Sequence, residues 1–480
     1  MRNVATTINY TLKILWRKLA VNRAGRIISL YALLFLIFFN GKLRNLAPNN
    51  EPEAPPSPPE AETPPIPKFS VVNENVIPVR EKFPDIPYER WYMSNATLRT
   101  SSFTLSLGEG KKEIAKIWPE NHGVNDRVEN QLLYSKYSDD MLSGHYRFHS
   151  TKTILFAGQK VKSSKRLPVG KAYFYKTGCP VKNCRLTYDL DKAKEADAIV
   201  FKDYVNGEFI EGYKRPLNQI WMLSLLEPPN YSKDFNPYKD RINWTATYRH
   251  DSELVTPYEK FVLYDRNIKS KNQTENIAAK KRGFKHQPGR IAWFVSNCEA
   301  PNNRLAYAKE LAKYYPVDIF GRCGPHKCDL SRQEKCLSIL QKDYKYYLAF
   351  ENSNCRWYIT EKFWIALRAE VVPIVMGAPV SDYEAVAPYG SFIHVDNYAH
   401  PKQLAEYLHY LDAHDAEYNE YFRWTGTGEL INTYSYCRLC TLMHSEYPRM
   451  SYGDVQTWWQ MGGTACSNDK NNFTLARVGP

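Results

Sequence analysis

Short apolar runs alternate with amphipathic stretches from about residue 150 to residue 424. Apolar runs bounded by turn residues predict buried strands, and apolar positions that recur every three or four residues predict helices that cover a sheet. The first group of predicted strands lies at 153–158, 197–201, 220–226 and, with a weaker pattern, 242–248. This grouping predicts one parallel sheet with its covering helices.

A second group follows a polar, basic stretch at 266–289 that has no strand pattern and is interpreted as a linker between domains. Its predicted strands lie at 290–297, 317–321, 346–352, 371–377 and 391–396, and its predicted helices at 303–315, 359–370 and 401–424. Two such groups predict an α/β fold with two Rossmann-like parallel-sheet domains facing a cleft. Ligands of these folds bind at the carboxyl ends of the strands.

An uncharged apolar stretch near the N-terminus predicts a membrane anchor. The apolar core, 27–39, is short for a hydrocarbon layer of about 30 Å, so the expected transmembrane signal anchor extends over 27–43. All charged residues before this run are basic. This asymmetry predicts a cytosolic tail over 1–26 and a lumenal body. A cleaved signal peptide is the alternative, but no small-residue cleavage site follows the run. A short anchor suits the thinner membranes of the early secretory pathway.

Composition divides the rest of the chain. Residues 47–67 are rich in proline and acid and predict an extended stem, which we place over 44–88. Residues 89–150 are polar and mixed and receive no assignment. The two predicted domains then cover 151–285 and 286–445, and residues 446–480 form a C-terminal tail.

Charge and cysteine content narrow the partners and the compartment. The 480 residues carry a net charge of +13 and include 35 tyrosines, which favours anionic ligands and polar ligands such as sugars. Nucleic acid would also suit the charge, but a lumenal body would not meet it. The even number of cysteines, 10, is expected where disulfides form. The Asn-x-Ser/Thr patterns after the anchor are candidate N-glycosylation sites: Asn95, Asn230, Asn243, Asn272 and Asn472.

The stretch "FENSNCRWYITEKFW", 350–364, joins a predicted strand to a predicted helix. The free N–H groups of a helix N-terminus attract phosphate. Capping alone explains Thr360 as the N-cap and Glu361 in the first turn. It explains Lys362 less well, because a cation there opposes the helix dipole, so this lysine is better justified if an anion meets it.

Arg304 begins the helix that follows the predicted strand 290–297, in a turn of the same kind. Two cations at the carboxyl edge of one sheet could hold a diphosphate, with the arginine as a bidentate ligand and Lys362 as a point charge. The alternative is a pair of ordinary surface cations.

Three motifs carry a resemblance to a known family. The stretch 350–364 resembles the donor-binding signature of the α1,3-fucosyltransferases of glycosyltransferase family 10, approximately FEN(S/T)…Y(V/I)TEK. "INWTATYRHDSELVTPY", 242–258, resembles a second motif, NWTxxYRxDSD, with Glu253 in place of the last acid. "AWFVSNC…NNRLAYAKEL" resembles a third, and the three occur in family order over about residues 150–445. "FENSN", "VMGAP", "YFRWTGTGE" and "CRLC" resemble the arthropod and plant branch that modifies the N-glycan core.

The resemblance implies a GT-B architecture, in which 286–445 binds GDP-fucose and 151–285 faces the acceptor. It implies that the donor is contacted by Asn352, Tyr358, Glu361 and Lys362 and that Arg304 holds the diphosphate. It also implies that no metal cofactor is required, although Mn²⁺ can stimulate activity. "DLD", at Asp189–Asp191, matches a metal-binding pattern of other glycosyltransferases, but its charged surroundings favour a surface position.

An inverting transfer needs a base for the acceptor hydroxyl, and the resemblance implies that Glu227 is that base. Glu227 follows the apolar run 220–226, where an acid can be partly withdrawn from water. The alternative is an acid that only marks the end of a strand. Arg249 and Asp251 are interpreted as a structural or acceptor-side pair. Trp357 stands where many relatives have Asp, and we expect it to line the cleft.

Cys179 with Cys184, and Cys437 with Cys440, have metal-like spacing. In the cytosol they could form a zinc site, whereas in the lumen disulfides are expected. The family resemblance implies that the first pair bridges to the second. Cys298 and Cys355 both follow predicted strands of the second domain and are therefore expected to be neighbours.

These observations predict a Golgi type II membrane enzyme that transfers fucose from GDP-fucose to the 3-hydroxyl of GlcNAc. The preferred acceptor, by branch resemblance, is the Asn-linked GlcNAc of N-glycoproteins. One alternative is the same reaction on antennal, Lewis-type GlcNAc. Another is an inactive glycan-binding protein on the same fold. The expected partners are GDP-fucose, N-glycoproteins and the Golgi membrane, without nucleic acid.

Overall fold

The structure is a computed structural model. It describes residues 88–89, 91–93, 98–99, 127–134, 150–157, 167–205, 207–264, 290–328, 333–445 and 451–467. The predicted anchor 27–43, nearly all of the predicted stem and the predicted linker 266–289 lie outside these residues. Within the described residues, no helix combines the length and the apolarity needed to cross a membrane.

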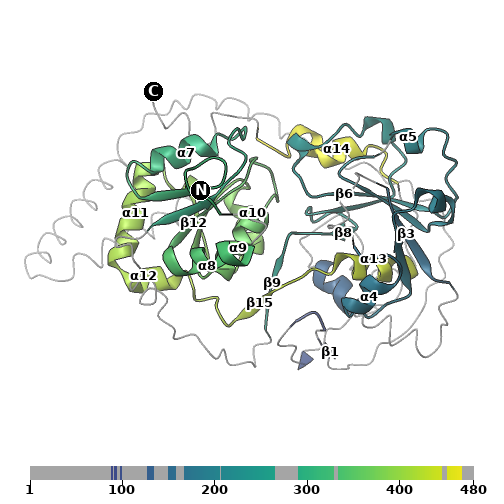
Figure 1. Ribbon diagram of the computed structural model, residues 1–480, viewed down its shortest axis with the longest axis horizontal. Coiled ribbons are helices and arrows are strands. Elements are labelled where there is room, and N and C mark those ends of the chain that lie inside the picture. The colour runs from purple at the N-terminus through teal and green to yellow at the C-terminus, as the bar shows by residue number, and fades with distance from the viewer. Residues whose placement is uncertain are drawn as a thin grey trace, which may run out of the picture. The chain divides into compact units, whose positions relative to one another are not determined.

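The first sheet contains six parallel strands in the order β4-β3-β5-β6-β7-β8 (Figure 1). The strands are β3 (Lys152–Phe156), β4 (Cys184–Thr187), β5 (Ala198–Lys202), β6 (Ile220–Leu225), β7 (Trp244–Thr247) and β8 (Leu254–Val255). Short helices connect them: α4 (Ala172–Lys176), η4 (Leu190–Glu195), α5 (Gly207–Ile210), η5 (Pro229–Tyr231) and η6 (Asn236–Tyr238). Alternate residues of β5 and β6 enter two different core clusters, so the centre of this sheet is buried on both faces.

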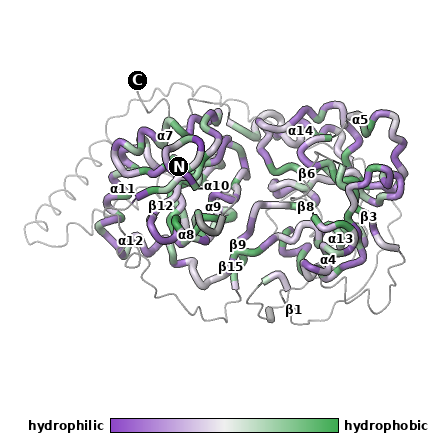
Figure 2. Tube along the Cα trace, in the orientation of Figure 1, coloured by the Kyte–Doolittle hydropathy of each residue, from purple (hydrophilic) through white to green (hydrophobic). Residues whose placement is uncertain are grey.

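The second sheet contains five parallel strands in the order β11-β10-β12-β13-β14. The strands are β10 (Ile291–Phe294), β11 (Val317–Phe320), β12 (Tyr346–Phe350), β13 (Val372–Met376) and β14 (Ile393–His394). The helices are α7 (Arg304–Leu311), α8 (Gln333–Asp343), α9 (Glu361–Arg368), α10 (Val380–Val386), η8 (Val395–Asn397), α11 (Pro401–Ala413) and α12 (Asp415–Glu420). Figure 2 shows mixed hydrophilic and hydrophobic positions along α7 and α11, as expected of helices with one buried side. The predicted α/β architecture with two parallel sheets is confirmed.

The prediction of a single helix over 401–424 is wrong in one respect. The structure has two helices, α11 and α12, because His414 adopts a non-helical backbone (φ −132°, ψ 84°). The His414 ring lies against the Tyr410 carbonyl oxygen (2.7 Å), and this contact satisfies an acceptor at the end of α11.

The C-terminal elements return to the first sheet. The strand β9 (Lys260–Leu263) pairs antiparallel with β15 (Gly428–Ile431), and a small pair is formed by β1 (Tyr88–Glu89) and β2 (Leu98–Arg99). Helix α13 (Ser435–His444) packs into the core of the first sheet, although it falls inside the predicted range 286–445. We call residues 451–467 the C-terminal segment; it carries α14 (Val455–Trp459) and η9 (Met461–Gly463) and packs on the opposite face. In Figure 1 the yellow helices α13 and α14 lie among the teal elements of this sheet.

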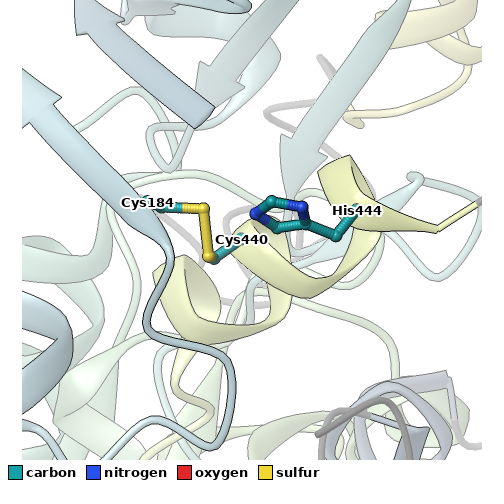
Figure 3. A group of neighbouring side chains, drawn as sticks. All are labelled: Cys184, Cys440 and His444. Carbon is teal, nitrogen blue, oxygen red and sulfur yellow. A yellow bond between two sulfur atoms is a disulfide. The ribbon is translucent and has the colours of Figure 1, made fainter. Parts of the chain in front are cut away.

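Disulfides connect these distant parts of the chain. Cys179 bonds to Cys437 and Cys184 to Cys440, as the family resemblance implied. Figure 3 shows the His444 ring beside the second of these bonds, where it contacts the Asn183 carbonyl oxygen (3.1 Å). Sulfurs in a disulfide are not thiolates, so this Cys–Cys–His group is not a metal site in the oxidised protein.

The remaining cysteines form three further disulfides. Cys298 pairs with Cys323 and Cys355 with Cys466, so the two cysteines that were expected to be neighbours are not bonded to each other. Cys328 pairs with Cys336. The Cys355–Cys466 bond joins the turn after β12 to the C-terminal segment, which the sequence pattern did not indicate.

Candidate active site

The β12–α9 turn, residues 351–360, is organised around the Glu351 carboxylate. Glu351 directly follows β12, and its side chain is completely buried. It accepts hydrogen bonds from the Thr360 backbone N–H (2.8 Å), the Thr360 hydroxyl (2.9 Å) and the Lys362 ammonium (3.0 Å). Sequence reasoning assigned this residue no role. The available signal was an acid immediately after a fully apolar strand, which demands a partner when buried.

Lys362 lies in the first turn of α9, as predicted, but the chain itself supplies an anion for it. Its ammonium donates to Glu351, to the Thr360 hydroxyl oxygen (2.6 Å) and to Glu361 (3.2 Å). Burial lowers the pKa of Lys362, but the two neighbouring carboxylates outweigh burial and leave the pKa above its usual value. In the free protein the negative charge that the sequence suggested for this lysine is therefore supplied by Glu351 and Glu361, and a ligand can still displace one of these partners.

Thr360 is the N-cap of α9, but not through its side chain. Its backbone is extended at the cap position, and its hydroxyl group makes no capping hydrogen bond. The hydroxyl instead donates to Glu351 and accepts from Lys362, so it connects the two charged groups.

Arg304 begins α7, and its side chain is 4% exposed, so it is not an ordinary surface cation. It donates to the carbonyl oxygens of Phe350 (2.6 Å) and Asn297 (3.1 Å), at the carboxyl ends of two neighbouring strands. Burial lowers the pKa of Arg304, and the Glu351 carboxylate opposes that effect. The guanidinium therefore lies at the same edge of the sheet as Lys362, as the sequence predicted.

Buried polar atoms gather at this edge without a partner in the described part of the protein. They are Arg304 Nε, Asn352 Oδ1 and Ser353 Oγ. Buried polar atoms are normally hydrogen-bonded, and exceptions require an explanation such as a missing ligand. A polar ligand at the carboxyl edge of the second sheet would supply those partners.

Glu227 lies two residues after the end of the first-sheet strand β6 and faces the β12–α9 turn. The Tyr358 hydroxyl donates a long hydrogen bond to Glu227 (3.4 Å), which brings together residues from the two sheets. Tyr258 donates to the neighbouring Leu226 carbonyl oxygen (3.0 Å). Glu227 is exposed, so the structure does not show the partial withdrawal from water that the sequence suggested for it.

Trp357 lies at the same junction. Its backbone is left-handed (φ 63°), and the buried Asp382 carboxylate accepts from its N–H (2.6 Å). Its ring centroid is 4.2 Å from that of His250, which follows the first-sheet strand β7. The Trp357 side chain is therefore partly buried between residues of both sheets.

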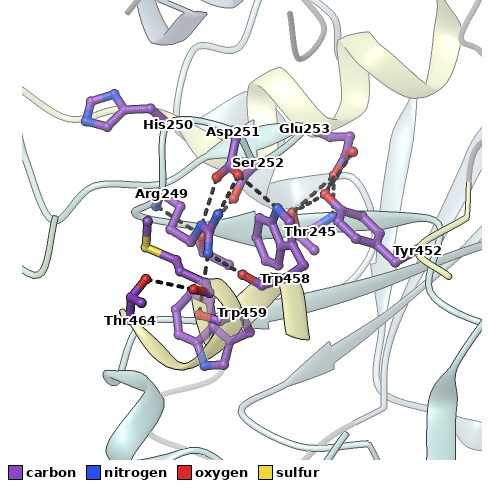
Figure 4. A network of polar contacts seen from close by, with 12 residues as sticks. Thr245, Arg249, His250, Asp251, Ser252, Glu253, Tyr452, Trp458, Trp459 and Thr464 are labelled. Atoms are coloured by element: carbon purple, nitrogen blue, oxygen red, sulfur yellow. Dashed lines mark hydrogen bonds and ion pairs between the residues drawn. The ribbon is translucent and has the colours of Figure 1, made fainter. Parts of the chain in front are cut away.

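Arg249 and Asp251 form a structural pair beside this junction (Figure 4). Two guanidinium nitrogens donate to the Asp251 carboxylate (2.8 and 2.5 Å). A third donates to the Trp458 carbonyl oxygen, and the guanidinium lies 4.2 Å from the Trp458 ring. The Trp458 indole N–H returns a hydrogen bond to Asp251 (2.9 Å). The pair therefore holds α14 against the first sheet, which is a structural role.

Two other predicted groups occupy different positions. Asp189 and Asp191 are exposed, and the Asp189 side chain accepts from the Asp191 N–H (3.2 Å), which agrees with the surface interpretation. Of the glycosylation candidates, Asn230 is exposed in η5, whereas Asn243 is half-buried. Asn95, Asn272 and Asn472 lie outside the described residues.

The second sheet thus presents two cations and unpartnered polar atoms, and the first sheet presents a carboxylate to the same junction. This arrangement can hold an anionic ligand on the second sheet and offers a carboxylate beside it, as a transferase requires. Two family models match the chain: "Fucosyltransferase, N-terminal" over residues 149–259 and "Glycosyltransferase family 10 (fucosyltransferase) C-term" over residues 284–458. The chain belongs to glycosyltransferase family 10, the GDP-fucose-dependent α1,3-fucosyltransferases.

Two curated relatives and one solved structure are similar to this chain. Glycoprotein 3-alpha-L-fucosyltransferase A of Drosophila melanogaster is 44% identical over 371 residues, which cover 76% of this chain and 70% of the relative. Alpha-(1,3)-fucosyltransferase 4 of Mus musculus is 35% identical over 256 residues, which cover 51% of this chain and 56% of the relative. The crystal structure of an α1,3-fucosyltransferase with GDP-fucose matches with a TM-score of 0.41 and 17% identity, covering 66% of this chain and 98% of that chain.

Proposed function

We propose that this α1,3-fucosyltransferase transfers fucose from GDP-fucose to the 3-hydroxyl of the Asn-linked GlcNAc of N-glycoproteins. The observation that carries the proposal is the contact between Tyr358 and Glu227. It brings an exposed carboxylate from the first sheet to the β12–α9 turn, which carries Asn352 and leads into Glu361 and Lys362 at the start of α9. A donor on the second sheet and an acceptor near Glu227 would then meet at this contact.

The proposed reaction is a single displacement with inversion at the fucose anomeric carbon. Glu227 accepts the proton of the acceptor hydroxyl, whose oxygen forms the new bond to that carbon. The bond from the carbon to the phosphate oxygen breaks, and its electron pair leaves with GDP. Arg304 and Lys362 stabilise the negative charge that develops on the diphosphate. Glu361 accepts hydrogen bonds from sugar hydroxyls, and Trp357 borders the acceptor.

The choice of acceptor is supported by the relatives. The similarity to the insect glycoprotein 3-alpha-L-fucosyltransferase covers 371 residues at 44% identity, whereas the mouse alpha-(1,3)-fucosyltransferase match covers 256 residues at 35%. This difference favours a core glycoprotein acceptor over an antennal one. We further propose a Golgi location with residues 27–43 as the membrane anchor.

The test uses the full-length chain with GDP-fucose and an N-glycopeptide that exposes terminal GlcNAc, and mass spectrometry locates the added fucose. Fucose on the Asn-linked GlcNAc that resists an α1,6-specific fucosidase is the expected result. Fucose on an antenna alone would retain the reaction and overturn the proposed acceptor. Folded protein that binds GDP but transfers fucose to neither position would favour the inactive glycan-binding alternative.

A further inference from the structure

The ammonium group of Lys362 has three hydrogens, and three acceptors surround it unequally. Glu351 and the Thr360 hydroxyl oxygen are buried, at 3.0 and 2.6 Å. Glu361 is the most distant acceptor, at 3.2 Å, and its side chain is 47% exposed. The first two acceptors are therefore fixed, and Glu361 is the acceptor that a ligand can replace.

Glu351 is held by more than its bond to the lysine. Both the backbone N–H and the hydroxyl of Thr360 donate to it. The chain also makes room for it, because a Cβ atom at Gly377 would lie 2.7 Å from the Glu351 Cβ, and the φ of Gly377 is +145°. A side chain at residue 377 would thus clash with the glutamate and strain the backbone. Glycine at the end of β13 allows this carboxylate to occupy its buried position.

We propose that Glu351 is a positioning residue for Lys362. It holds the ammonium so that a phosphate oxygen of the sugar donor takes the place of Glu361 as the third acceptor. The inference rests on the proposed function, in which Lys362 meets the donor diphosphate. When the phosphate arrives, one anion replaces another beside the lysine, and the Glu361 carboxylate becomes available to sugar hydroxyls.

In the free enzyme, Glu351 stabilises the positive charge of the buried lysine. A buried lysine without an opposite charge favours its neutral form, which would not attract a diphosphate. Glu351 keeps the lysine charged and oriented before the donor binds, so little reorganisation is needed when it does. A purely structural ion pair would stabilise the fold without this effect on the donor, and the two cases are separable by ligand choice.

The test compares the binding of GDP and GMP, which lacks the second phosphate, to full-length variants. In K362M, we expect GDP affinity to fall about tenfold or more, as for loss of a hydrogen bond to a charged group, with a smaller change for GMP. In E351Q, we expect the same preferential loss of GDP affinity. The KM for GDP-fucose should rise, the turnover number should fall, and the KM for the acceptor should stay unchanged. The double variant E351Q/K362M should bind GDP no more weakly than K362M, because Glu351 acts through the lysine.

Two further variants complete the design. Asp412 forms a buried ion pair with Lys345 at the same 3.0 Å separation in the same sheet's domain, away from the turn. Its variant D412N should lose stability but keep the ratio of GDP to GMP affinity. If E351Q does not fold, T360V takes its place, since it removes the hydroxyl between Glu351 and Lys362 and should lower GDP affinity more than GMP affinity.

The outcomes separate the inference from the proposed function. An unchanged ratio of GDP to GMP affinity in K362M would remove the proposed role of Lys362 and, with it, the inference. A reduced ratio in K362M with an unchanged or increased ratio in E351Q would overturn the inference alone. Additive losses in the double variant would likewise show that Glu351 does not act through Lys362.

Discussion

At the scale of single residues, Glu253 has an unusual environment for an acid. Its side chain is completely buried, and it accepts from the Thr245 N–H (2.7 Å) and the Tyr452 hydroxyl (2.9 Å). Burial raises the pKa of Glu253 from 4.5 to about 7, although these hydrogen bonds favour the charged form. Figure 4 shows this group next to the Arg249–Asp251 pair. The folded protein therefore holds the proton more tightly than the unfolded chain.

This raised pKa predicts that stability falls as the pH rises from about 4.5 to about 7. In that range the unfolded chain loses the proton while the folded protein keeps it, so ionisation favours unfolding, by up to about 3 kcal/mol above pH 7. The variant E253Q, which cannot ionise, should be the more stable protein at pH 8 and similar to the wild type at pH 5. Denaturant midpoints at the two pH values test this. If E253Q were less stable than the wild type by the same amount at pH 5 and pH 8, the prediction would be contradicted.

Glu227 supplies a second prediction at this scale. Replacing it by glutamine keeps the size and removes the base, so turnover should fall by about 10²- to 10⁴-fold. GDP affinity should stay the same, because Glu227 belongs to the first sheet. Steady-state kinetics and calorimetric titration with GDP measure the two quantities. Normal turnover in E227Q would exclude Glu227 as the base.

At the scale of elements, Gly377 at the end of β13 leaves the space that Glu351 of the β12–α9 turn occupies. The variant G377A should destabilise the protein by about 1–3 kcal/mol from backbone strain alone. It should also weaken GDP binding, because the new methyl group lies too close to Glu351. Gly390 provides the matched control: its φ is +69°, and an added Cβ would meet nothing within 4 Å. G390A should carry only the strain, and thermal unfolding with GDP titration distinguishes the two. Equal GDP affinities in both variants would contradict the predicted displacement of Glu351.

Contacts at the start of strand β7 distinguish the glycosylation candidates Asn243 and Asn230. The Asn243 side-chain oxygen accepts from the Trp221 N–H (2.9 Å) and from Arg215 (3.1 Å), and Thr245 of the same pattern is fully buried. A glycan at Asn243 would displace these contacts, whereas Asn230 is exposed. Folded protein from a secretory host should therefore carry a glycan at Asn230 and none at Asn243. Peptide mapping after N-glycosidase treatment reads both sites. A glycan on Asn243 in active enzyme would show that β7 tolerates its displacement.

Sequence patterns predicted elements where burial follows from local composition. The strands β6, β12 and β13 are almost wholly apolar, so their positions were found to within a few residues. The edge strand β4, Cys184–Thr187, was not predicted because the exposed Arg185 interrupts its short apolar run. Lys362 and Arg304 were predicted at the correct edge because helix starts mark the carboxyl ends of strands. The role of Glu351 was not predicted, although it is an acid directly after an apolar strand, because its contacts with Thr360 and Lys362 and the space left by Gly377 arise only in the tertiary fold.

At the scale of the whole molecule, the C-terminal segment covers one face of the first sheet and is bonded to the β12–α9 turn. Val455 and Trp459 are completely buried in the core that contains Trp221 and Leu223. The Trp459 indole donates to Ser232 (2.8 Å), which lies close to Glu227 in sequence. The segment then reaches Cys355 through Cys466, with backbone bonds from Arg356 N–H to Ala465 (2.8 Å) and from Ser467 N–H to Asn354 (2.8 Å). One stretch of chain thus touches both halves of the candidate site.

A truncation tests this dependence. A chain that ends at residue 450 loses α14 and Cys466, and deletion of even one buried tryptophan side chain typically costs about 3–5 kcal/mol. Since domains are stable by only about 5–15 kcal/mol, the shortened protein should not fold. A chain that ends at residue 467 is the control and should keep its protease resistance and activity. Protease-resistant protein from the shorter chain would show that the first sheet is stable without the C-terminal segment.

The placement of the disulfides has a consequence for biosynthesis. Cys179 and Cys184 leave the ribosome 258 and 256 residues before their partners, and Cys355 precedes Cys466 by 111 residues. These three bonds cannot close until Cys437, Cys440 and Cys466 have been translated. The early cysteines must therefore stay reduced, or exchange their first partners, until that point. Native disulfide formation in this protein thus follows the synthesis of α13 and the C-terminal segment, and the first sheet cannot be covalently secured before those elements exist.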